Sequence, residues 1–277
     1  MSKVTMRLGH SPDPDDAFMF YGIASGKVGS DSIEFVHVIE DIQSLNRRAL
    51  DGELEMTALS AHSYLHVQGR YRILDCGASM GEGYGPIVVS KKNLEDLRDK
   101  RVAIPGKLTT AYLLLLLYAQ DFSAVELPFD EIMDAVSDGE VDAGLLIHEG
   151  QLTYGDAGLV KALDLGELWA ADTPLPMPLG VNAVRRDISE DLQNEILRVH
   201  KESIDYGLAH KERALEYALK YGRGLSRSQC EEFVLMYVND LTRGLGDRGR
   251  KALELLFERA YERGIIGEKA RLDILDG

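Results

Sequence analysis

The feature that most constrains the fold is a regular alternation of short apolar runs with helix-like stretches. The apolar runs are VTMRLG, SIEFVHVI, LEMTALS and GPIVVS, and helix-like stretches at 15–25, 41–51 and 60–67 follow the first three. A strand that is followed by a helix and a further strand typically returns in the same direction, because the helix crosses back over the sheet. The sequence therefore predicts an α/β fold with a largely parallel sheet.

The alternation restarts after a charged connector, KKNLEDLRDK, which predicts a second, smaller α/β unit. Its elements are RVAIPG, a helix from Thr109, AVELPF, a helix near 129–137, DAGLLIH and GLVKALDL. The unit ends near the proline-rich DTPLPMPLG, after which VNAVRRD predicts one more strand and 188–265 predicts successive amphipathic helices. We therefore predict a smaller lobe, 93–177, inserted into a larger lobe made of 1–92 and 178–277.

Charge and cysteine content exclude several classes of function. Lys and Arg number 31 against 46 Asp and Glu, a net charge of -15 that argues against nucleic acid or an anionic membrane as a partner. The two cysteines, Cys76 and Cys230, form no C-x-x-C motif and predict neither a disulfide framework nor a thiolate metal site. The N-terminus has no run of signal-peptide character, so we expect a cytoplasmic protein. The run AYLLLLLYA is too short to cross a bilayer and predicts a buried helix.

Four strand-to-helix junctions hold polar residues that suit a ligand site. They are HSPDPDD at 10–16, LSAHS at 59–63, PGKLTT at 105–110 and IHEGQLTY at 147–154. In open α/β sheets ligands bind beyond the carboxyl ends of the strands, where helix N-termini present unpaired N–H groups. The sequence thus predicts one ligand site built from these four junctions.

The PGKLTT junction resembles a cradle for a carboxylate. Gly106 permits a tight turn, and Thr109 and Thr110 can supply hydroxyl and N–H groups at the start of a helix. It is not a phosphate-binding Walker loop, because the G-x-x-x-x-G-K-[ST] spacing is absent. The alternative is that Thr109 is only a helix N-cap.

His148 follows the apolar run DAGLLI, so its imidazole is expected at the carboxyl end of a strand and suits proton transfer near neutral pH. The segment HEGQL is not the zinc motif H-E-x-x-H, since Leu152 stands where the second histidine is required. His62 and His66 have helical i, i+4 spacing, but no third ligand follows from the sequence. We therefore expect no metal.

Two further motifs are incomplete. GASMG fits G-x-S-x-G but is followed by a turn and a strand rather than a helix, which argues against a serine hydrolase. GEGYG lacks the spacing and the helix of a dinucleotide-binding loop.

The first junction holds three acids, Asp13, Asp15 and Asp16, in a single turn. We expect Asp15 or Asp16 to cap the helix that begins there, where its charge meets the positive end of the helix dipole. Ser11 and the other acids are then expected to edge the ligand crevice and to accept hydrogen bonds from substrate hydroxyls. Calcium is the alternative, but the D-x-D-x-D-G spacing is missing.

With these junctions in place, the chain resembles the 1,4-dihydroxy-6-naphthoate synthase family of the futalosine route to menaquinone. The resemblance rests on SPDPDDAFMFY, EDIQSLNRRALDGELEMTALS, GYGPIVVS, VAIPGKLTTAYLLL, GEVDAGLLIHEGQLTY and LPLGVNAVRRD. It implies a two-lobed fold like that of type 2 periplasmic binding proteins, with the ligand cleft between the lobes. It also implies a carbon–carbon lyase that splits cyclic dehypoxanthine futalosine, a small carboxylate, without metal or organic cofactor.

The resemblance also implies roles for individual residues. His148 matches the proposed catalytic base, Ser60, Thr109 and Thr110 match the substrate pocket, and Asp16 matches the acid of the opening motif. The family commonly reads S-P-C-P-N-D-T-F at that motif. Here Asp13 therefore replaces a cysteine, Asp15 replaces an asparagine and Ala17 replaces a threonine, and LSAHSY predicts His62 in or near the pocket.

Three functions are consistent with these residues. The first is the lyase, in which His148 removes a hydroxyl proton and starts a retro-aldol-like cleavage. The second is a solute-binding protein on the same scaffold, which the missing export signal argues against. The third is the sister activity, chorismate dehydratase, over which the segment HEGQLTY favours the lyase.

Overall fold

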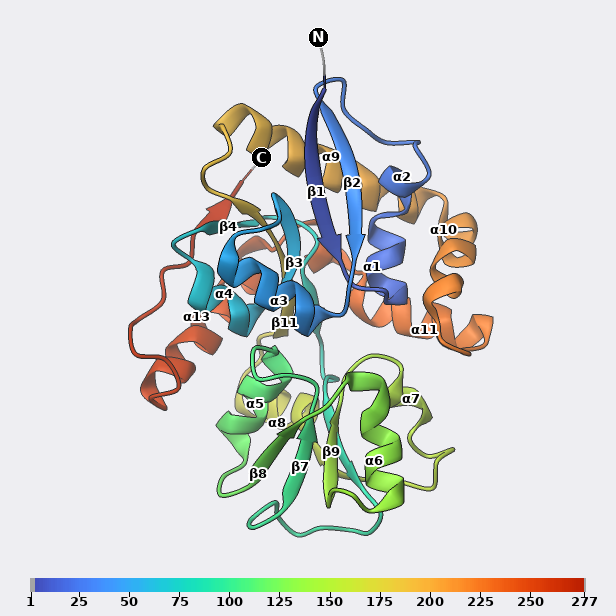
Figure 1. The fold of residues 1–277 in the computed structure, drawn as a ribbon, viewed down its shortest axis with the longest axis vertical. Coiled ribbons are helices and arrows are strands. Elements are labelled where there is room, and N and C mark those ends of the chain that lie inside the picture. Colours follow the sequence, from blue (N-terminus) through green and yellow to red (C-terminus); the bar gives the residue numbers. More distant parts are fainter. Residues whose placement is uncertain (1–2, 277) are drawn as a thin grey trace.

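The structure is a computed structural model that describes residues 3–276. It is built on two β-sheets, which Figure 1 shows one above the other. The seven-stranded sheet has the order β12-β4-β11-β3-β1-β2, with β5 paired to β11, and the five-stranded sheet has the order β10-β6-β9-β7-β8. The strands are β1 (Val4–His10), β2 (Ile33–Ile39), β3 (Met56–Ser60), β4 (Tyr71–Leu74), β5 (Ser79–Gly81), β6 (Ile87–Ser90), β7 (Arg101–Ile104), β8 (Ser123–Glu126), β9 (Ala143–Leu146), β10 (Val160–Asp164), β11 (Met177–Arg185) and β12 (Ile274–Leu275).

Helices connect these strands and cover the sheets, and the last third of the chain after β11 is almost entirely helical. The helices are α1 (Pro14–Met19), α2 (Tyr21–Ala24), α3 (Ile42–Asp51), α4 (Ala61–Val67), α5 (Thr110–Tyr118), α6 (Ile132–Asp138), α7 (Gly150–Thr153), α8 (Leu165–Asp172), α9 (Glu190–Ala209), α10 (Lys211–Ala218), α11 (Arg227–Tyr237), α12 (Asp240–Arg243) and α13 (Gly246–Glu262), with 3-10 turns η1 (Phe129–Glu131) and η2 (Leu219–Tyr221). The predicted α/β class is confirmed.

The prediction of a largely parallel sheet is wrong, because both sheets are mixed. In the larger sheet β1 runs parallel to β2 and β3, but β11 runs antiparallel to β3, β4 and β5. The chain enters β11 from α8, which follows β10 of the five-stranded sheet, so β11 does not continue a strand–helix–strand unit of the larger sheet and its direction is not tied to that of its neighbours. In the smaller sheet β6 is antiparallel to β9 and β10.

The pairing of β6 also corrects one predicted boundary. A larger lobe of 1–92 and 178–277 would include β6, but Val88 and Val89 pair with Leu145 and Gly144 of β9 in the five-stranded sheet. The apolar run GPIVVS has the same pattern as the three apolar runs before it, so the sequence predicts a strand there but does not indicate which sheet the strand joins. The rest of the division into two lobes stays a prediction.

The apolar run at 111–119 forms α5, a buried helix as predicted. Leu113, Leu114 and Leu115 are fully buried, and they belong to a core cluster that also contains Val181 of β11 and Leu256 of α13. This core therefore extends from the helix that follows β7 to the central strand of the larger sheet. Among residues 3–276, the longest apolar stretches of helix fall short of what a membrane crossing requires.

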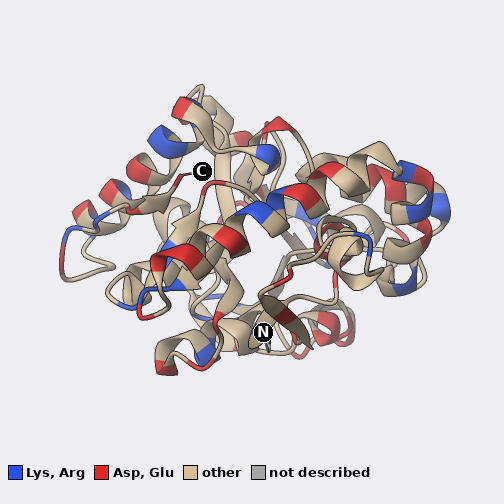
Figure 2. Ribbon diagram, turned by 90° about the horizontal axis from the view of Figure 1, so that it is seen from above, with Lys and Arg blue, Asp and Glu red and all other residues tan. Residues whose placement is uncertain are grey.

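The net charge of -15 is distributed rather than concentrated. Figure 2 shows acidic and basic residues interspersed along the helices. Many of them form surface pairs such as Arg198 with Glu202 and Arg243 with Asp205. Pairs of this kind contribute little to stability individually, so the charge mainly favours solubility.

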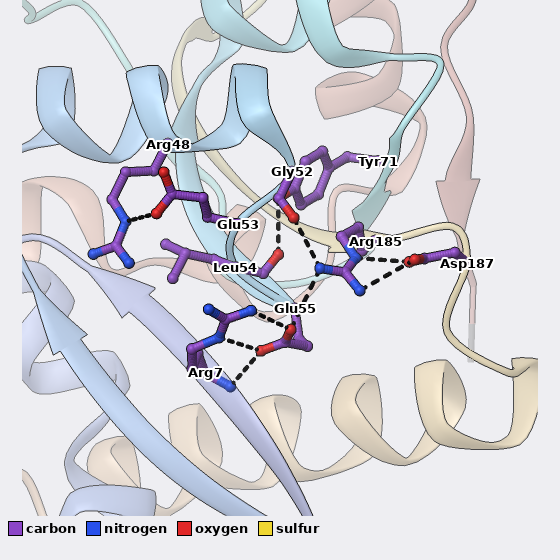
Figure 3. A network of polar contacts seen from close by, with 9 residues as sticks. All are labelled: Arg7, Arg48, Gly52, Glu53, Leu54, Glu55, Tyr71, Arg185 and Asp187. Carbon is purple, nitrogen blue, oxygen red and sulfur yellow. Dashed lines mark hydrogen bonds and ion pairs between the residues drawn. The ribbon is translucent and has the colours of Figure 1, made fainter.

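One polar network, drawn in Figure 3, connects the larger sheet at the start of β3. The Glu55 carboxylate accepts hydrogen bonds from the backbone N–H of Arg7 at 2.8 Å and from its Nε at 2.9 Å, and Arg185 Nη1 lies 3.4 Å away. Arg185 also donates to the carbonyl of Gly52 at 2.8 Å. Burial raises the pKa of Glu55, but the bonds from Arg7 outweigh burial and hold that pKa below its usual value.

Replacing Glu55 tests this network. We expect Glu55→Gln to lower the free energy of unfolding by about 1–3 kcal/mol at pH 7, because charge-assisted hydrogen bonds are lost. The depressed pKa means that the contribution of Glu55 is present above the unfolded-state pKa and is lost as pH falls through the folded-state pKa, so the difference should shrink in acid. Urea unfolding at pH 7 and pH 4 measures both effects.

The matched control is Glu53→Gln, since Glu53 pairs with Arg48 at the same end of β3 and its side chain is 45% exposed. We expect a change below about 1 kcal/mol for this exposed pair. Equal losses for the two variants would contradict the assignment.

Candidate active site

A pocket lies where the four predicted junctions meet, at the ends of β1, β3, β7 and β9. Its empty space, part of which is open to solvent, is about 710 Å³. The residues to which a catalytic or binding role was assigned all line it: Ser11, Asp16, Ser60, Thr109, Thr110 and His148. Asp13, Asp15, Ser79, Gln151, Asn182 and Tyr237 line it as well. The junction pattern therefore brings these residues together.

The three acids of the first junction have different positions from those expected. Asp13, not Asp15 or Asp16, is the N-cap residue of α1, and its side chain makes no capping hydrogen bond. Pro14 occupies the first turn, where its missing N–H costs nothing, and Asp15 and Asp16 follow it there. The prediction of a capping carboxylate is wrong, because none of the three side chains accepts a hydrogen bond from the first backbone N–H groups of α1. The three carboxylates contact other residues instead.

Asp16 is tied to Ser11. Its Oδ2 accepts from the Ser11 N–H at 2.6 Å and lies 2.8 Å from Ser11 Oγ, which is 2.5 Å from Asp13 Oδ2. One hydroxyl hydrogen can serve only one of these two carboxylates. Burial and the charge of Asp13 outweigh the bonds from Ser11 and raise the pKa of Asp16 to about 7. A proton on Asp16 supplies the second hydrogen that the arrangement needs.

Asp15 faces the same pocket with few donors. Ser79 Oγ lies 3.4 Å from its Oδ2. Burial, followed by the charges of Asp16 and Asp13, raises the pKa of Asp15 well above its usual value. A protonated carboxyl at this position resembles the amide of asparagine in shape and charge and can both donate and accept hydrogen bonds.

The Asp13 carboxylate is ionised although it is buried, because the Arg223 guanidinium and the His148 imidazole adjoin it. Its Oδ2 is 3.1 Å from His148 Nδ1, and its Oδ1 is 2.5 Å from Arg223 Nη2. Burial raises the pKa of Asp13, but His148, Arg223 and the hydrogen bond from Ser11 outweigh burial and hold that pKa below its usual value. Asp13, for which the sequence suggested no specific role, is thus the acceptor at the centre of the cluster.

His148 lies in the loop between β9 and α7 with its ring edge-to-face against Phe129, 4.8 Å between centroids. Its backbone has a φ of 60°, which is uncommon for a residue other than glycine and costs about 1–3 kcal/mol. Asp13 Oδ2 lies 3.1 Å from Nδ1, so Nε2 is the ring nitrogen that this carboxylate does not contact. Nε2 has no hydrogen-bond partner among residues 3–276.

Arg223 is the residue of this cluster that the sequence did not reveal. It lies between η2 and α11, 210 residues from Asp13, within the otherwise unremarkable segment GRGLS. Besides Asp13, it donates to the carbonyl of Pro12 at 2.8 Å and to Glu149 Oε1 at 2.5 Å, and its guanidinium lies 4.7 Å from the Phe129 ring centroid. No local pattern points to it, because its partners come from distant segments.

The hydroxyls of Thr109 and Thr110 are already used within the protein. Thr109 Oγ1 donates to the Gly106 carbonyl at 2.8 Å and caps α5 by accepting from Tyr112 N–H at 3.2 Å. Thr110 Oγ1 donates to the Leu179 carbonyl at 2.5 Å. The first N–H groups of a helix have no acceptor within it, so the backbone N–H groups of Thr110 and Ala111 are the donors that α5 offers to an anion.

The turn before α5 depends on glycine at position 106. Gly106 has a φ of 153°, and a Cβ there would meet Gln43 Cδ at 2.3 Å. Gln43 Oε1 accepts from the Leu108 N–H at 3.2 Å, which ties the turn to α3. Close approach of these two segments thus sets the position of the α5 N-terminus.

Ser60 offers a further donor on the other side of the pocket. Its N–H donates to Asn46 Oδ1 at 2.9 Å and its Oγ accepts from Asn46 Nδ2 at 3.0 Å, which leaves its hydroxyl proton for a ligand. His62 does not line the pocket. Its Nδ1 lies 3.2 Å from the Thr109 carbonyl, and burial followed by the charge of His66 lowers its pKa to about 4.

The fold and the pocket define a class of protein. The solved structure of the alkanesulfonate-binding protein of Xanthomonas axonopodis pv. citri matches with a TM-score of 0.73 at 13% identity, covering 98% of both chains, so the fold is that of periplasmic binding proteins. The chain combines this two-sheet fold with a small-molecule pocket at its strand ends.

Comparisons at higher identity show the family. A family model described as menaquinone biosynthesis matches residues 6–262. A protein of Thermus thermophilus named 1,4-dihydroxy-6-naphthoate synthase is 43% identical over 266 residues, 96% of this chain and 97% of that protein. A solved protein of Archaeoglobus fulgidus is 52% identical with a TM-score of 0.92, covering 95% of this chain and 98% of the other. The chain belongs to this menaquinone-biosynthesis family.

The N-cap of α5 can be tested by substitution. We expect Thr109→Ala to lower the free energy of unfolding by about 1 kcal/mol, because a Tyr112 N–H loses its acceptor, whereas Thr109→Ser keeps the hydroxyl and most of the stability. Urea unfolding of both variants measures the difference. Equal losses for the alanine and serine variants would show that the methyl group, not the hydroxyl, matters.

Proposed function

We propose that the protein is a cytoplasmic carbon–carbon lyase that converts cyclic dehypoxanthine futalosine to 1,4-dihydroxy-6-naphthoate. Family membership and the name of the Thermus thermophilus relative support the reaction class. The observation that supports the chemistry is the position of His148. It lines the same pocket as the N-terminus of α5, and its Nε2 has no partner among residues 3–276.

In the proposed reaction, the substrate carboxylate binds the N–H groups at the start of α5 and the hydroxyl of Ser60. His148 Nε2 takes the proton of a sugar-derived hydroxyl, that oxygen becomes a carbonyl, and the adjacent carbon–carbon bond breaks. The electrons of that bond pass into the ring system, which becomes the aromatic dihydroxynaphthoate. The imidazolium that forms is stabilised by the Asp13 carboxylate at 3.1 Å.

Asp15, Asp16 and Ser11 are proposed to hold the sugar hydroxyls. The raised pKa values of Asp15 and Asp16 support this assignment, since neutral carboxyls repel an anionic substrate less than carboxylates do and still form hydrogen bonds. No step of this proposal requires a metal ion or an organic cofactor, and the partner is the small carboxylate substrate.

A solute-binding role and chorismate dehydratase are less well supported. The solute-binding neighbour is 13% identical, which bears on the fold and not on the ligand. The relative of 43% identity carries the naphthoate synthase name over 96% of this chain.

The direct test is incubation of the purified protein with cyclic dehypoxanthine futalosine. We expect the substrate to disappear and 1,4-dihydroxy-6-naphthoate to accumulate, as followed by mass spectrometry. Chorismate, offered in parallel, should remain unchanged. Binding of the futalosine derivative with no release of the naphthoate would favour the solute-binding alternative.

The base is tested by His148→Asn, which keeps a polar side chain and removes the proton acceptor. We expect kcat to fall roughly 100-fold to 10,000-fold, the usual contribution of general acid–base catalysis, with substrate affinity largely retained. Stopped-time product assays and isothermal titration with the substrate measure the two quantities. Turnover near the parent rate would exclude His148 as the base even if the lyase reaction is confirmed.

A further inference from the structure

The residues around the buried Asp13 carboxylate are held in an unusual backbone geometry that neither helix capping nor substrate binding explains. The Asp13 side chain is only 3% exposed, yet it contacts His148, Arg223 and Ser11 within 3.1 Å. His148 and Arg223 both have positive φ, 60° and 43°, although neither is glycine. Two uncommon backbone conformations thus meet at one buried carboxylate, which indicates that the surroundings impose this geometry.

We propose that Asp13 and Arg223 form a positioning pair that holds the imidazole of His148 in place, with Nδ1 beside the Asp13 carboxylate and Nε2 left for the substrate. Asp13 acts on His148 directly through the contact at 3.1 Å. Arg223 acts through Asp13, which it holds from the opposite carboxylate oxygen. This inference rests on the proposed role of His148 as the base.

Arg223 also holds the loop that carries His148. Its Nε and Nη2 donate to the two carboxylate oxygens of Glu149, the next residue after His148, at 2.5 and 2.9 Å. Its guanidinium stacks on Phe129, whose ring also packs against the imidazole of His148. The guanidinium therefore fixes the imidazole through three neighbours: Asp13, Glu149 and Phe129. A lysine cannot reproduce this planar fork.

The arrangement is electrostatic as well as steric. The titratable groups beside His148 or lining its pocket are Asp13, Asp15 and Asp16 at α1, Glu149 in its own loop, Arg223 before α11, and Tyr237 of α11. Asp13 favours the imidazolium and Arg223 opposes it. Removing the charge of Asp13 and removing the charge of Arg223 should therefore have opposite effects on the protonation of His148. Loss of packing alone would not produce opposite effects.

The experiment compares wild type with Asp13→Asn, Arg223→Gln and Arg223→Lys. NMR titration of the imidazole resonances, assigned to His148 by their absence in His148→Asn, gives the midpoint of its protonation. We expect the midpoint to be lower in Asp13→Asn and higher in Arg223→Gln than in wild type. Arg223→Lys should stay near wild type because the charge is retained.

Kinetics test the positioning role. We expect kcat to fall by up to roughly 100-fold in Asp13→Asn and Arg223→Gln, with KM changed little, because misplacing the base affects the chemical step more than binding. The ascending limb of the pH–rate profile should move with the NMR midpoint in each variant. Arg223→Lys should recover the position of that limb but only part of kcat, since the charge returns without the fork.

The matched control is Arg227→Gln, four residues along the chain, whose side chain is 50% exposed and pairs with Glu212. It should leave both kcat and the midpoint unchanged. Midpoints that stay fixed, or that move in the same direction in Asp13→Asn and Arg223→Gln, would overturn the inference. Should Asp13→Asn not fold, the comparison of the two Arg223 variants decides: a midpoint that fails to rise in Arg223→Gln, or that rises equally in Arg223→Lys, would overturn the inference.

The NMR result also separates this inference from the proposed function. If wild type releases no naphthoate while the midpoints shift in opposite directions, the lyase assignment fails and the pair is confirmed only as an electrostatic one. If wild type is active and the variants keep its kcat and profile, the lyase assignment holds and the positioning role fails.

Discussion

The burial of the Asp13 carboxylate is the constraint on which the arrangement of the site depends. An unpaired carboxylate in such a place is very costly, so the fold must supply cations and hydrogen bonds to it. Ser11 supplies a hydroxyl from the same turn, His148 comes from the loop after β9, and Arg223 comes from the segment before α11. One buried charge thus connects the N-terminal junction, the five-stranded sheet and the C-terminal helices, and these contacts determine where the imidazole lies.

Strand topology determines which junctions can meet around this charge. β1 and β3 are parallel neighbours, so the turn that holds Asp13 and the turn that holds Ser60 lie at one edge of the larger sheet. β7 and β9 are parallel neighbours in the smaller sheet and place Thr109 and His148 at one edge as well. β11 runs antiparallel beside β3, and its Leu179 carbonyl accepts from Thr110. A hydrogen bond therefore joins the start of α5 directly to the central strand of the larger sheet.

The sequence predicted those features that depend on local patterns. Apolar runs located β1, β3 and α5, and residues at the strand ends located Ser60, Thr109 and His148, because the carboxyl end of a strand is marked by the residues that follow it. Features set by distant partners were not predicted. Which sheet β6 joins depends on β9, which lies more than fifty residues further along the chain, as the register of Val88 with Leu145 shows. The importance of Arg223 depends on Asp13, 210 residues before it.

The same distinction explains the error over the three acids. Local rules assign an acid at a helix start to capping, and they treat the three carboxylates as alike. Tertiary contacts separate them: partners lower the pKa of Asp13, while burial raises the pKa of Asp15 and Asp16. The folded state therefore binds more protons at Asp16 than the unfolded state does between pH 3.8 and about 7, so ionising it there costs stability. In return, the neutral carboxyls of Asp15 and Asp16 lie beside the ionised carboxylate of Asp13. The neutral groups can bind the hydroxyls of an anionic substrate, and the carboxylate can stabilise an imidazolium.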